Sequence, residues 1–184
     1  DLAGADAFKV ELLEAVNGEL SGPKSVLFQA QETGTFQTWI AAKSGQWKWL
    51  KGIKEASEPR NEWQKQGFSD APWTTGTAPF GYGREGVQTA LNDMRNNYTT
   101  VYLRHEIELD SPDSMGSLQF HTTYDDGFAI WINGFELARI GLPAGELPFN
   151  GRASESDFAP REWSAVIPAA KIPSLATGKN IVAV

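Results

Sequence analysis

The clearest alternation of apolar and polar positions lies between residues 100 and 109. One side of this segment carries Val101, Leu103, His105, Ile107 and Leu109, and the other carries Tyr102, Arg104, Glu106 and Glu108. A period of two with one apolar face is typical of a strand in an antiparallel sheet. The pattern therefore predicts a half-buried strand whose outer face is mostly charged.

Two further strand patterns follow, each ending at turn residues. Leu118, Phe120, Thr122 and Tyr124 alternate before Asp125-Asp126-Gly127, and the apolar run Phe128–Ile132 leads through Asn133-Gly134 into Phe135–Ile140. An Asn-Gly pair favours a type I′ turn, because both of its central residues need a positive φ. We expect each turn to close a hairpin, so that residues 117–140 form two β-hairpins at the heart of an antiparallel β-sandwich.

The remaining elements are predicted from shorter patterns. Strands are expected at residues 10–16, 26–31, 36–40, 47–51, 163–167 and 181–184, a helical turn at 169–171 and a short helix at 90–97. Long loops rich in Trp, Gly and Pro separate several of these, and such loops stay compact when their own aromatic side chains pin them.

Residues 1–44 are expected to be N-terminal strands, either part of the sandwich or the remnant of a preceding module. Residues 45–184 are expected to form the sandwich domain.

Composition limits the class of protein further. The 184 residues carry a net charge of -7, which argues against a nucleic-acid partner because phosphate binding needs clustered Lys and Arg. No apolar run approaches the roughly 20 residues of a membrane-spanning helix. The chain has no Cys, and its 7 Trp and 18 Gly favour an extracellular or cell-surface protein. The apolar ending at residues 181–184 leads us to expect further domains of a longer parent chain.

Several short motifs, taken in order, resemble a known fold family. They are Phe68-Ser69-Asp70, Trp73, Gly81-Tyr82-Gly83, the strand containing Tyr102 and Arg104, Tyr124-Asp125-Asp126-Gly127, and Trp131-Ile132-Asn133-Gly134. This succession, covering about residues 47–184, resembles the galactose-binding-domain-like jelly roll. It is similar to the sugar-binding domain of family 2 glycoside hydrolases and to accessory modules of large bacterial secreted proteins. The resemblance implies an all-β jelly roll that binds saccharides through its loops, often holds a structural calcium, and seldom carries catalytic residues.

Exposed aromatic side chains are the candidate sugar-binding residues. The apolar face of a pyranose stacks on an indole, while its hydroxyls meet planar polar side chains. We therefore predict a ligand site formed by Trp47, Trp49, Trp63, Arg84, Asp125 and Arg139. The alternative is that these tryptophans are buried, as is expected for Trp73, Trp131 and Trp163, because β-sandwiches often bury large aromatics.

Metal and catalytic signals are weak. A calcium site needs six to eight oxygen ligands, for which Asp93, Asp126 and Asp157 are the candidates, although Asp126 also suits a turn. No cofactor is predicted to be required. His105 and His121 are expected on inner faces of their strands, and no nucleophile elbow, Walker motif or zinc-protease motif occurs.

These observations leave three hypotheses in order. The first is a noncatalytic carbohydrate-binding module of a larger extracellular bacterial protein, whose partners are a polysaccharide or glycan and neighbouring domains. The alternative is a structural, self-assembling or adhesion β-sandwich without sugar binding. A polysaccharide-active enzyme domain ranks last, because no pair of acid and base residues is evident.

Overall fold

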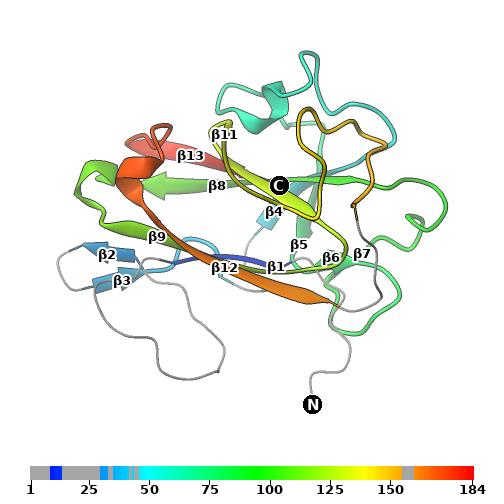
Figure 1. The fold of residues 1–184 in the computed structure, drawn as a ribbon, viewed down its shortest axis with the longest axis horizontal. Helices are drawn as coiled ribbons and strands as arrows, with labels where there is room; N and C mark the ends of the chain where they lie inside the picture. Colours follow the sequence, from blue (N-terminus) through cyan, green and yellow to red (C-terminus); the bar gives the residue numbers. More distant parts are fainter. Residues whose placement is uncertain (1–8, 14–29, 33–34, 42, 44–45, 155–159) are drawn as a thin grey trace.

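The computed structural model describes residues 9–13, 30–32, 35–41, 43, 46–154 and 160–184. These residues form two antiparallel sheets stacked face to face (Figure 1). The first sheet has the order β1 (Lys9–Leu13), β9 (Ser117–Tyr124) and β12 (Arg161–Pro168). The prediction of an all-β antiparallel sandwich is confirmed, whereas its jelly-roll topology stays a prediction.

The second sheet has six strands. Their order is β11 (Phe135–Ile140), β10 (Phe128–Ile132), β13 (Gly178–Ala183), β8 (Val101–Leu109), β4 (Gln46–Lys51) and β5 (Thr74–Thr77). The core lies between the two sheets and includes Leu103, Ile107, Leu118, Phe120 and Ile130, each at most 3% exposed. Strand alternation delivers these apolar side chains to the facing inner surfaces.

The smaller elements lie at the margins of the sheets. They are the hairpin of β2 (Ala30–Glu32) and β3 (Thr35–Gln37), the parallel pair β6 (Phe80–Gly81) and β7 (Thr89–Ala90), and the 3₁₀ turns η1 (Glu62–Gln64), η2 (Pro112–Ser114) and η3 (Ala169–Lys171). The predicted helical turn at residues 169–171 is confirmed. In the described part of the chain, no helix is long and apolar enough to cross a membrane.

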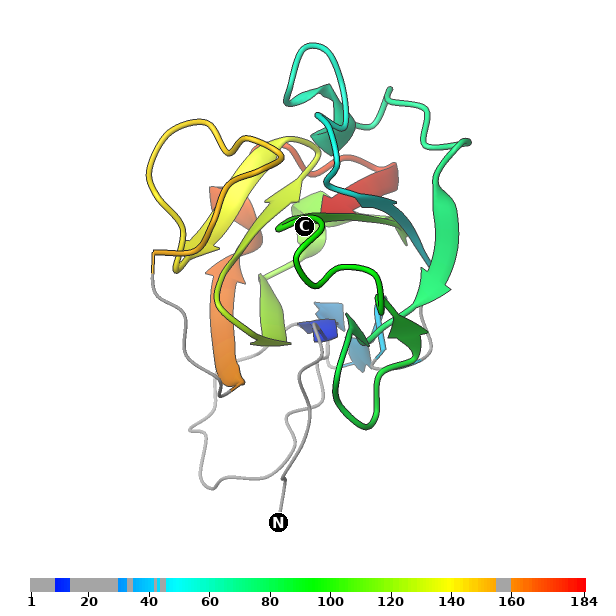
Figure 2. The same ribbon diagram turned by 90° about the vertical axis from the view of Figure 1, so that its right-hand side faces the viewer.

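The outer face of β8 differs from its prediction. Glu106 and Glu108 are exposed as expected, but Tyr102 is 5% and Arg104 only 2% exposed. The loops at residues 52–73 and 141–154 cover this half of the six-stranded sheet, on the side away from the other sheet (Figure 2). One half of β8 is therefore buried on both faces, which the alternation of a single strand does not reveal.

The turn after β9 also differs from its prediction. β9 pairs with β1 and β12, whereas β10 pairs with β11 and β13, so the two strands belong to opposite sheets. Asp125-Asp126-Gly127 is therefore a connection between sheets, and the predicted first hairpin is wrong. Asp126 has a φ of 66°, so these residues do turn the chain sharply, but turn chemistry alone does not specify which strands pair.

The Asn133-Gly134 hairpin is confirmed. Both residues have positive φ, 50° and 85°, and Ile132 pairs directly with Phe135 across the turn. The side chain of Asn133 also bonds to β13, because its Oδ1 accepts from the Ile181 backbone N–H at 2.8 Å. The turn therefore contributes to the sheet beyond its own two strands.

Residues near the N-terminus contribute β1 to the three-stranded sheet, where Leu12 pairs with Phe120. Ile40 is fully buried in the core, although the strand that precedes it ends at Gln37. The predicted strand positions 14–16 and 26–29 lie outside the described residues.

The short helix predicted at residues 90–97 is wrong. Successive turns occupy this segment, with the Met94 N–H donating to the Leu91 carbonyl and the Asn97 N–H donating to the Met94 carbonyl. Asn96 has a φ of 62°, which ends any helical continuation.

Candidate ligand-binding site

The tryptophans of β4 point into the core. Trp47 is 1% exposed, and the centroid of its ring lies 5.0 Å from that of His105. Trp49 is 9% exposed, and the centroid of its ring lies 6.1 Å from that of Phe80. The alternation correctly placed both on one face, but that face is the inner one. The prediction that they form an exposed sugar platform is therefore wrong, and the lysines that alternate with them lie on the opposite face.

Trp63 is also buried, at 4% exposure, but on the outer face of the six-stranded sheet. Its ring makes edge contacts with Tyr102 at 4.9 Å and with Trp131 at 5.6 Å, and lies 6.2 Å from Trp73. Such pairs stabilise the covering loops beyond the effect of their buried area. The expectation of an exposed Trp63 is wrong, whereas the predicted burial of Trp73 and Trp131 is confirmed.

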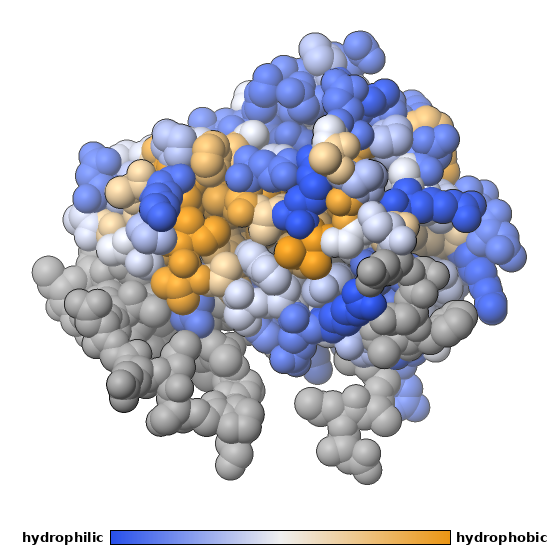
Figure 3. Space-filling view, in the orientation of Figure 1, coloured by the Kyte–Doolittle hydropathy of each residue, from blue (hydrophilic) through white to orange (hydrophobic). Residues whose placement is uncertain are grey.

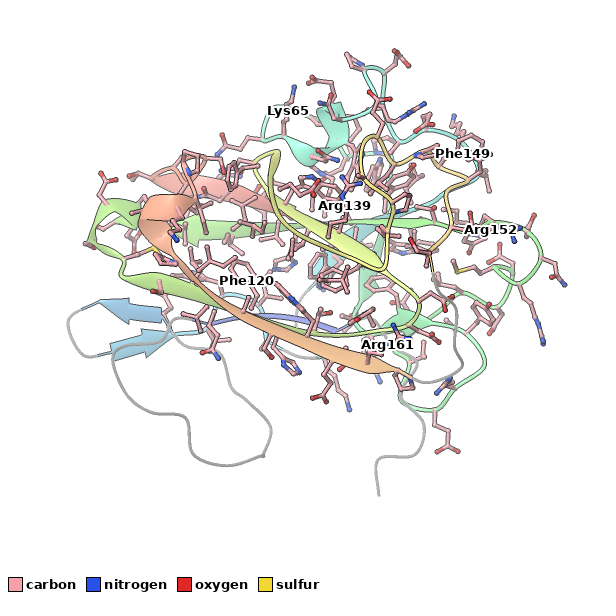
Figure 4. The ribbon with its side chains drawn as sticks, in the orientation of Figure 1. Lys65, Phe120, Arg139, Phe149, Arg152 and Arg161 are labelled. Carbon is pink, nitrogen blue, oxygen red and sulfur yellow. The ribbon has the colours of Figure 1, made fainter. Side chains whose placement is uncertain are left out.

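Arg139 holds the loop that follows β11. Its Nε and Nη2 donate to the two carboxylate oxygens of Glu136 at 2.9 and 2.6 Å, and its Nη1 donates to the carbonyls of Pro143 and Gly145 at 2.6 and 2.8 Å. The hydrogen bond from Arg139 lowers the pKa of Glu136 below its ordinary value. Figure 4 shows Arg139 on the side of the sheet over which this loop carries Phe149 and Arg152. A ligand contact by Arg139 stays a prediction, since most of its donors already bind the loop.

Arg84 and Asp125 come together as predicted. The Arg84 Nη2 lies 3.8 Å from the Asp125 Oδ2, and their side chains are 22% and 33% exposed. This ion pair joins the glycine-rich loop after β6 to the connection between β9 and β10. Both charged groups remain partly accessible at the end of the sandwich that carries the loops around residues 80–84, 91–103, 125–129 and 142–154, which we call the loop end.

The loop end contains a broad, open hollow of about 2150 Å³. Its lining comes from the segments around residues 80–84, 91–103, 125–129 and 142–154, together with Arg60, Trp63 and Trp131. Figure 2 faces this end of the molecule. Tyr82 lines the hollow and is 40% exposed, which makes it an accessible aromatic ring beside Arg84. Trp47 and Trp49 do not line it.

A small polar group lies beside the hollow on the outer face of the sheet. Arg60 lies 3.1 Å from Glu55 (Nε to Oε1) and 2.7 Å from Glu146 (Nη1 to Oε2). The Tyr102 hydroxyl and the Glu55 Oε2 are buried and have no hydrogen-bond partner among the described residues. Burial raises the pKa of Tyr102 well above its ordinary value, and the negative charge of Glu55 raises it further.

Comparison of the chain with protein-family models, curated proteins and solved structures finds no match. The resemblance to galactose-binding-domain-like modules therefore stays a prediction.

The two metal candidates that the structure describes, Asp93 and Asp126, are not part of a cluster of possible metal ligands. Asp93 accepts from the Lys51 Nζ at 2.5 Å and from the Tyr98 hydroxyl at 3.1 Å, and the bond from Lys51 lowers its pKa. Asp126 lies in the connection between the sheets, and Asp157 lies outside the described residues. Among the residues that the structure describes, no three His, Asp or Glu side chains gather as a metal site would require. A bound calcium stays a prediction.

His105 lies on the inner face of its sheet and His121 on the outer face of the other sheet. His105 is on the inner face as expected, and its Nδ1 is 2.8 Å from the Gln46 carbonyl oxygen. His121 alternates with the core residue Phe120 and therefore lies on the outer face of the three-stranded sheet, where its Nδ1 is 2.8 Å from the Ser164 hydroxyl. The inner-face prediction is wrong for His121.

Sequence reasoning missed Tyr82, Glu55, Arg60 and Tyr102 as members of the site region. A signal for Tyr82 was present, because an aromatic residue between two glycines has few neighbouring side chains to cover it. The other three had no local signal. Loops distant in sequence bring them together over the outer face of β8.

Proposed function

We propose that the chain is a noncatalytic carbohydrate-binding module of a larger extracellular protein, and that it binds glycan in the hollow at the loop end. The observation that supports this proposal is that the exposed ring of Tyr82 and the accessible ion pair of Arg84 and Asp125 line the same hollow. An aromatic ring stacks on the apolar face of a sugar, while guanidinium and carboxylate groups bind its hydroxyls in a planar geometry. Tyr82 thus takes the role that the sequence suggested for the tryptophans.

The charges in the hollow favour binding over hydrolysis. Glycoside hydrolysis needs one carboxylic acid with a raised pKa beside a second carboxylate. Here three of the four carboxylates that line the hollow, those of Asp125, Glu136 and Glu146 but not Asp126, each lie within 4 Å of an arginine nitrogen, and the pKa of Glu136 is lowered. Ion-paired carboxylates can accept hydrogen bonds from sugar hydroxyls but are poor proton donors.

A pull-down on insoluble polysaccharides, extended by a glycan array, tests the proposal. Tyr82→Ala should lower retention of the chain about tenfold or more, and Arg84→Ala should lower it severalfold. Phe135→Ala is the matched control, because Phe135 is 38% exposed on β11 but does not line the hollow. Failure of the intact chain to bind any glycan, or equal retention of the Tyr82 and Phe135 variants, would contradict the proposal.

A structural, self-assembling module is the second candidate. Two of the four exposed large apolar side chains in the described residues, Phe135 and Val166, lie on β11 and β12, which are edge strands of the two sheets. Figure 3 shows apolar residues gathered where Figure 1 draws these strands. Exposed apolar edge strands favour pairing with another chain. Sedimentation over a range of protein concentrations distinguishes the candidates, because self-assembly predicts association without glycan.

A further inference from the structure

The hollow at the loop end gathers arginines. Five of the seven arginines of the chain line it, whereas no lysine of the described residues does: they are Arg60, Arg84, Arg95, Arg139 and Arg152. Four carboxylates also line it, those of Asp125, Asp126, Glu136 and Glu146. Five positive and four negative side chains give the lining a net charge of +1, on a chain whose net charge is -7.

Three of these arginines are already held by carboxylates. The pairs are Arg84 with Asp125, Arg139 with Glu136, and Arg60 with both Glu146 and Glu55, which is outside the lining. Arg60 lies between two carboxylates, so its charge is fully balanced. The positive charge that the hollow offers to a ligand therefore comes from the other two arginines.

Arg95 and Arg152 are exposed, and neither side chain makes an ion pair or a hydrogen bond among the described residues. Arg95 lies in the turns that follow β7, and Arg152 lies in the loop that follows β11, where Figure 4 labels it. A guanidinium group has five N–H donors, and here all of them remain open to solvent or to a ligand.

The segment that carries Arg95 is fixed to the glycine-rich loop that carries Arg84. The Leu91 N–H donates to the Gly81 carbonyl at 2.7 Å, which joins the start of the segment to that loop. Within the segment, successive turns close at residues 94, 97 and 98 through backbone hydrogen bonds. Arg95 is therefore held at the same end of the sandwich as Arg84.

The loop that carries Arg152 is fixed to the other member of this ion pair. The Ser154 N–H donates to the Gly141 carbonyl at 2.7 Å. Gly141 lies against Gly127, where a Cβ would come within 3.1 Å of the Gly141 carbonyl oxygen. Gly127 follows Asp125 by two residues, and Asp125 is the carboxylate that pairs with the glycine-rich loop. The two unpaired arginines thus belong to loops that are joined through a single ion pair.

Two unpaired guanidinium groups in the same hollow as an accessible aromatic ring suit an acidic sugar. A guanidinium group binds a carboxylate or a sulfate through two parallel hydrogen bonds, a geometry that lysine does not offer. A neutral sugar gains nothing from the two charges, and a cationic sugar is repelled by them. A nucleic acid presents a run of phosphates, which needs a longer row of cations than two on a chain of net charge -7.

We infer that Arg95 and Arg152 bind the acidic groups of an anionic polysaccharide, which are the carboxylates of uronic acids or sulfate esters. The inference rests on the proposed function, because it names the class of glycan that is bound in the same hollow. Each guanidinium group takes one acidic group, so binding should weaken as salt screens these exposed charges.

Retention of the full chain on matched pairs of polysaccharides tests the inference. Polygalacturonate is compared with its fully methyl-esterified form, and carrageenan with agarose, a related galactan without sulfate. The chain should be retained at least about tenfold better by the acidic member of one pair or of both, and about 0.5 M NaCl should remove most of the difference. Preference within the first pair assigns carboxylates, and preference within the second assigns sulfate esters.

Variants identify the binding groups. Arg95→Gln combined with Arg152→Gln should lower retention by the acidic polymer about tenfold or more, while retention by its neutral partner stays within about twofold. Lys171→Gln combined with Lys179→Gln is the matched control, because it removes the same charge from two exposed residues that do not line the hollow. This control should change retention by either polymer less than about twofold.

The outcomes separate this inference from the proposed function. Equal retention within both pairs, equal effects of the two double variants, or retention of single-stranded DNA as strong as that of the acidic polysaccharides would overturn it. Retention by neutral polymers that depends on Tyr82 would leave the proposed function standing in each of those cases. Retention by acidic polymers that requires the two arginines but is unchanged in Tyr82→Ala would support the acidic site and contradict the stacking role of Tyr82.

Discussion

Arg104 on β8 and Asp70 in the covering loop form an ion pair of 2.8 Å between Nε and Oδ2, in which Arg104 is 2% and Asp70 27% exposed. The same guanidinium donates to the Trp63 carbonyl and to the carbonyls of Lys65 at 3.1 Å and Phe68 at 3.3 Å. One side chain thus ties an irregular segment to the sheet through four partners. The loop that carries Trp63 and Trp73 depends on this arginine for its position.

Arg104→Met should therefore destabilise the protein strongly. The change keeps most of the apolar stem but leaves Asp70 and three carbonyl oxygens without their donor, and breaking a buried pair in this way costs about 3–5 kcal/mol. Urea denaturation measures the free energy of unfolding. The control is Lys179→Met, which breaks the exposed pair with Glu106 and should change the free energy of unfolding far less than Arg104→Met does. Similar losses in both variants would show that Arg104 does not anchor the loop.

In the Asn133-Gly134 turn, replacing Asn133 by Ala should lower the free energy of unfolding more than replacing Gly134 by Ala. Asn133 Nδ2 donates to the Ser174 carbonyl at 2.6 Å and to the Asn180 Oδ1 at 2.8 Å, and its Oδ1 accepts from the Ile181 N–H. Asn133→Ala removes all three bonds and should cost roughly 2–4 kcal/mol. Gly134→Ala adds a side chain at a φ of 85° and should cost about 1–2 kcal/mol.

Urea denaturation of the two variants beside Asn92→Ala checks this order. Asn92 is exposed, so its replacement should leave the free energy of unfolding within about 0.5 kcal/mol of the unmodified chain. A greater loss for Gly134→Ala than for Asn133→Ala would mean that backbone strain dominates over the hydrogen bonds.

His105 should make stability depend on pH near neutrality. Burial lowers the pKa of His105 below its ordinary 6.5, although the hydrogen bond to Gln46 opposes the shift. Between that lowered pKa and 6.5, the unfolded chain binds a proton that the folded chain does not, so stability rises with pH in this window. We expect the free energy of unfolding to fall as pH decreases from 6.5 towards the lowered pKa of the folded state.

His105→Phe should remove this part of the pH dependence while keeping a ring against Trp47. Urea denaturation at about pH 7 and about pH 5.5 measures it, and the carboxylates titrate in both proteins, so their contribution cancels in the comparison. If the free energy of unfolding falls by the same amount between the two pH values in the variant and in the unmodified chain, His105 does not contribute to the pH dependence.

The sequence predicted the parts of the fold that local patterns specify. The alternation on β8 and β9 and the Asn133-Gly134 turn identified an antiparallel sandwich, because side-chain period and positive φ are local properties. Local sequence did not specify the strands with which β9 and β10 pair, because a turn such as Asp125-Asp126-Gly127 can close a hairpin or connect two sheets. Only the arrangement of β1, β12 and β13 beside them decides between the two.

The candidate site was predicted less well, for a related reason. Trp47 and Trp49 share a face, but whether that face is inner or outer depends on which sheet packs against it. Tyr102 alternates with core residues and was expected to be on an open face, yet loops from both sides in sequence cover it. Arg84 and Asp125 met as predicted because each lies in a turn at the same end of the sandwich.

Removal of the Tyr102 hydroxyl should not lower stability, whereas removal of the Tyr98 hydroxyl should. The Tyr102 hydroxyl is buried without a partner among the described residues, whereas the Tyr98 hydroxyl donates to the Asp93 carboxylate at 3.1 Å. Tyr102→Phe removes an unsatisfied group, so the free energy of unfolding should stay constant or rise by about 1 kcal/mol. Tyr98→Phe removes a bond to a charged acceptor and should lower it by about 1 kcal/mol or more. Urea denaturation of both variants measures the difference, and a loss of stability in Tyr102→Phe equal to that in Tyr98→Phe would mean that the Tyr102 hydroxyl is already paired.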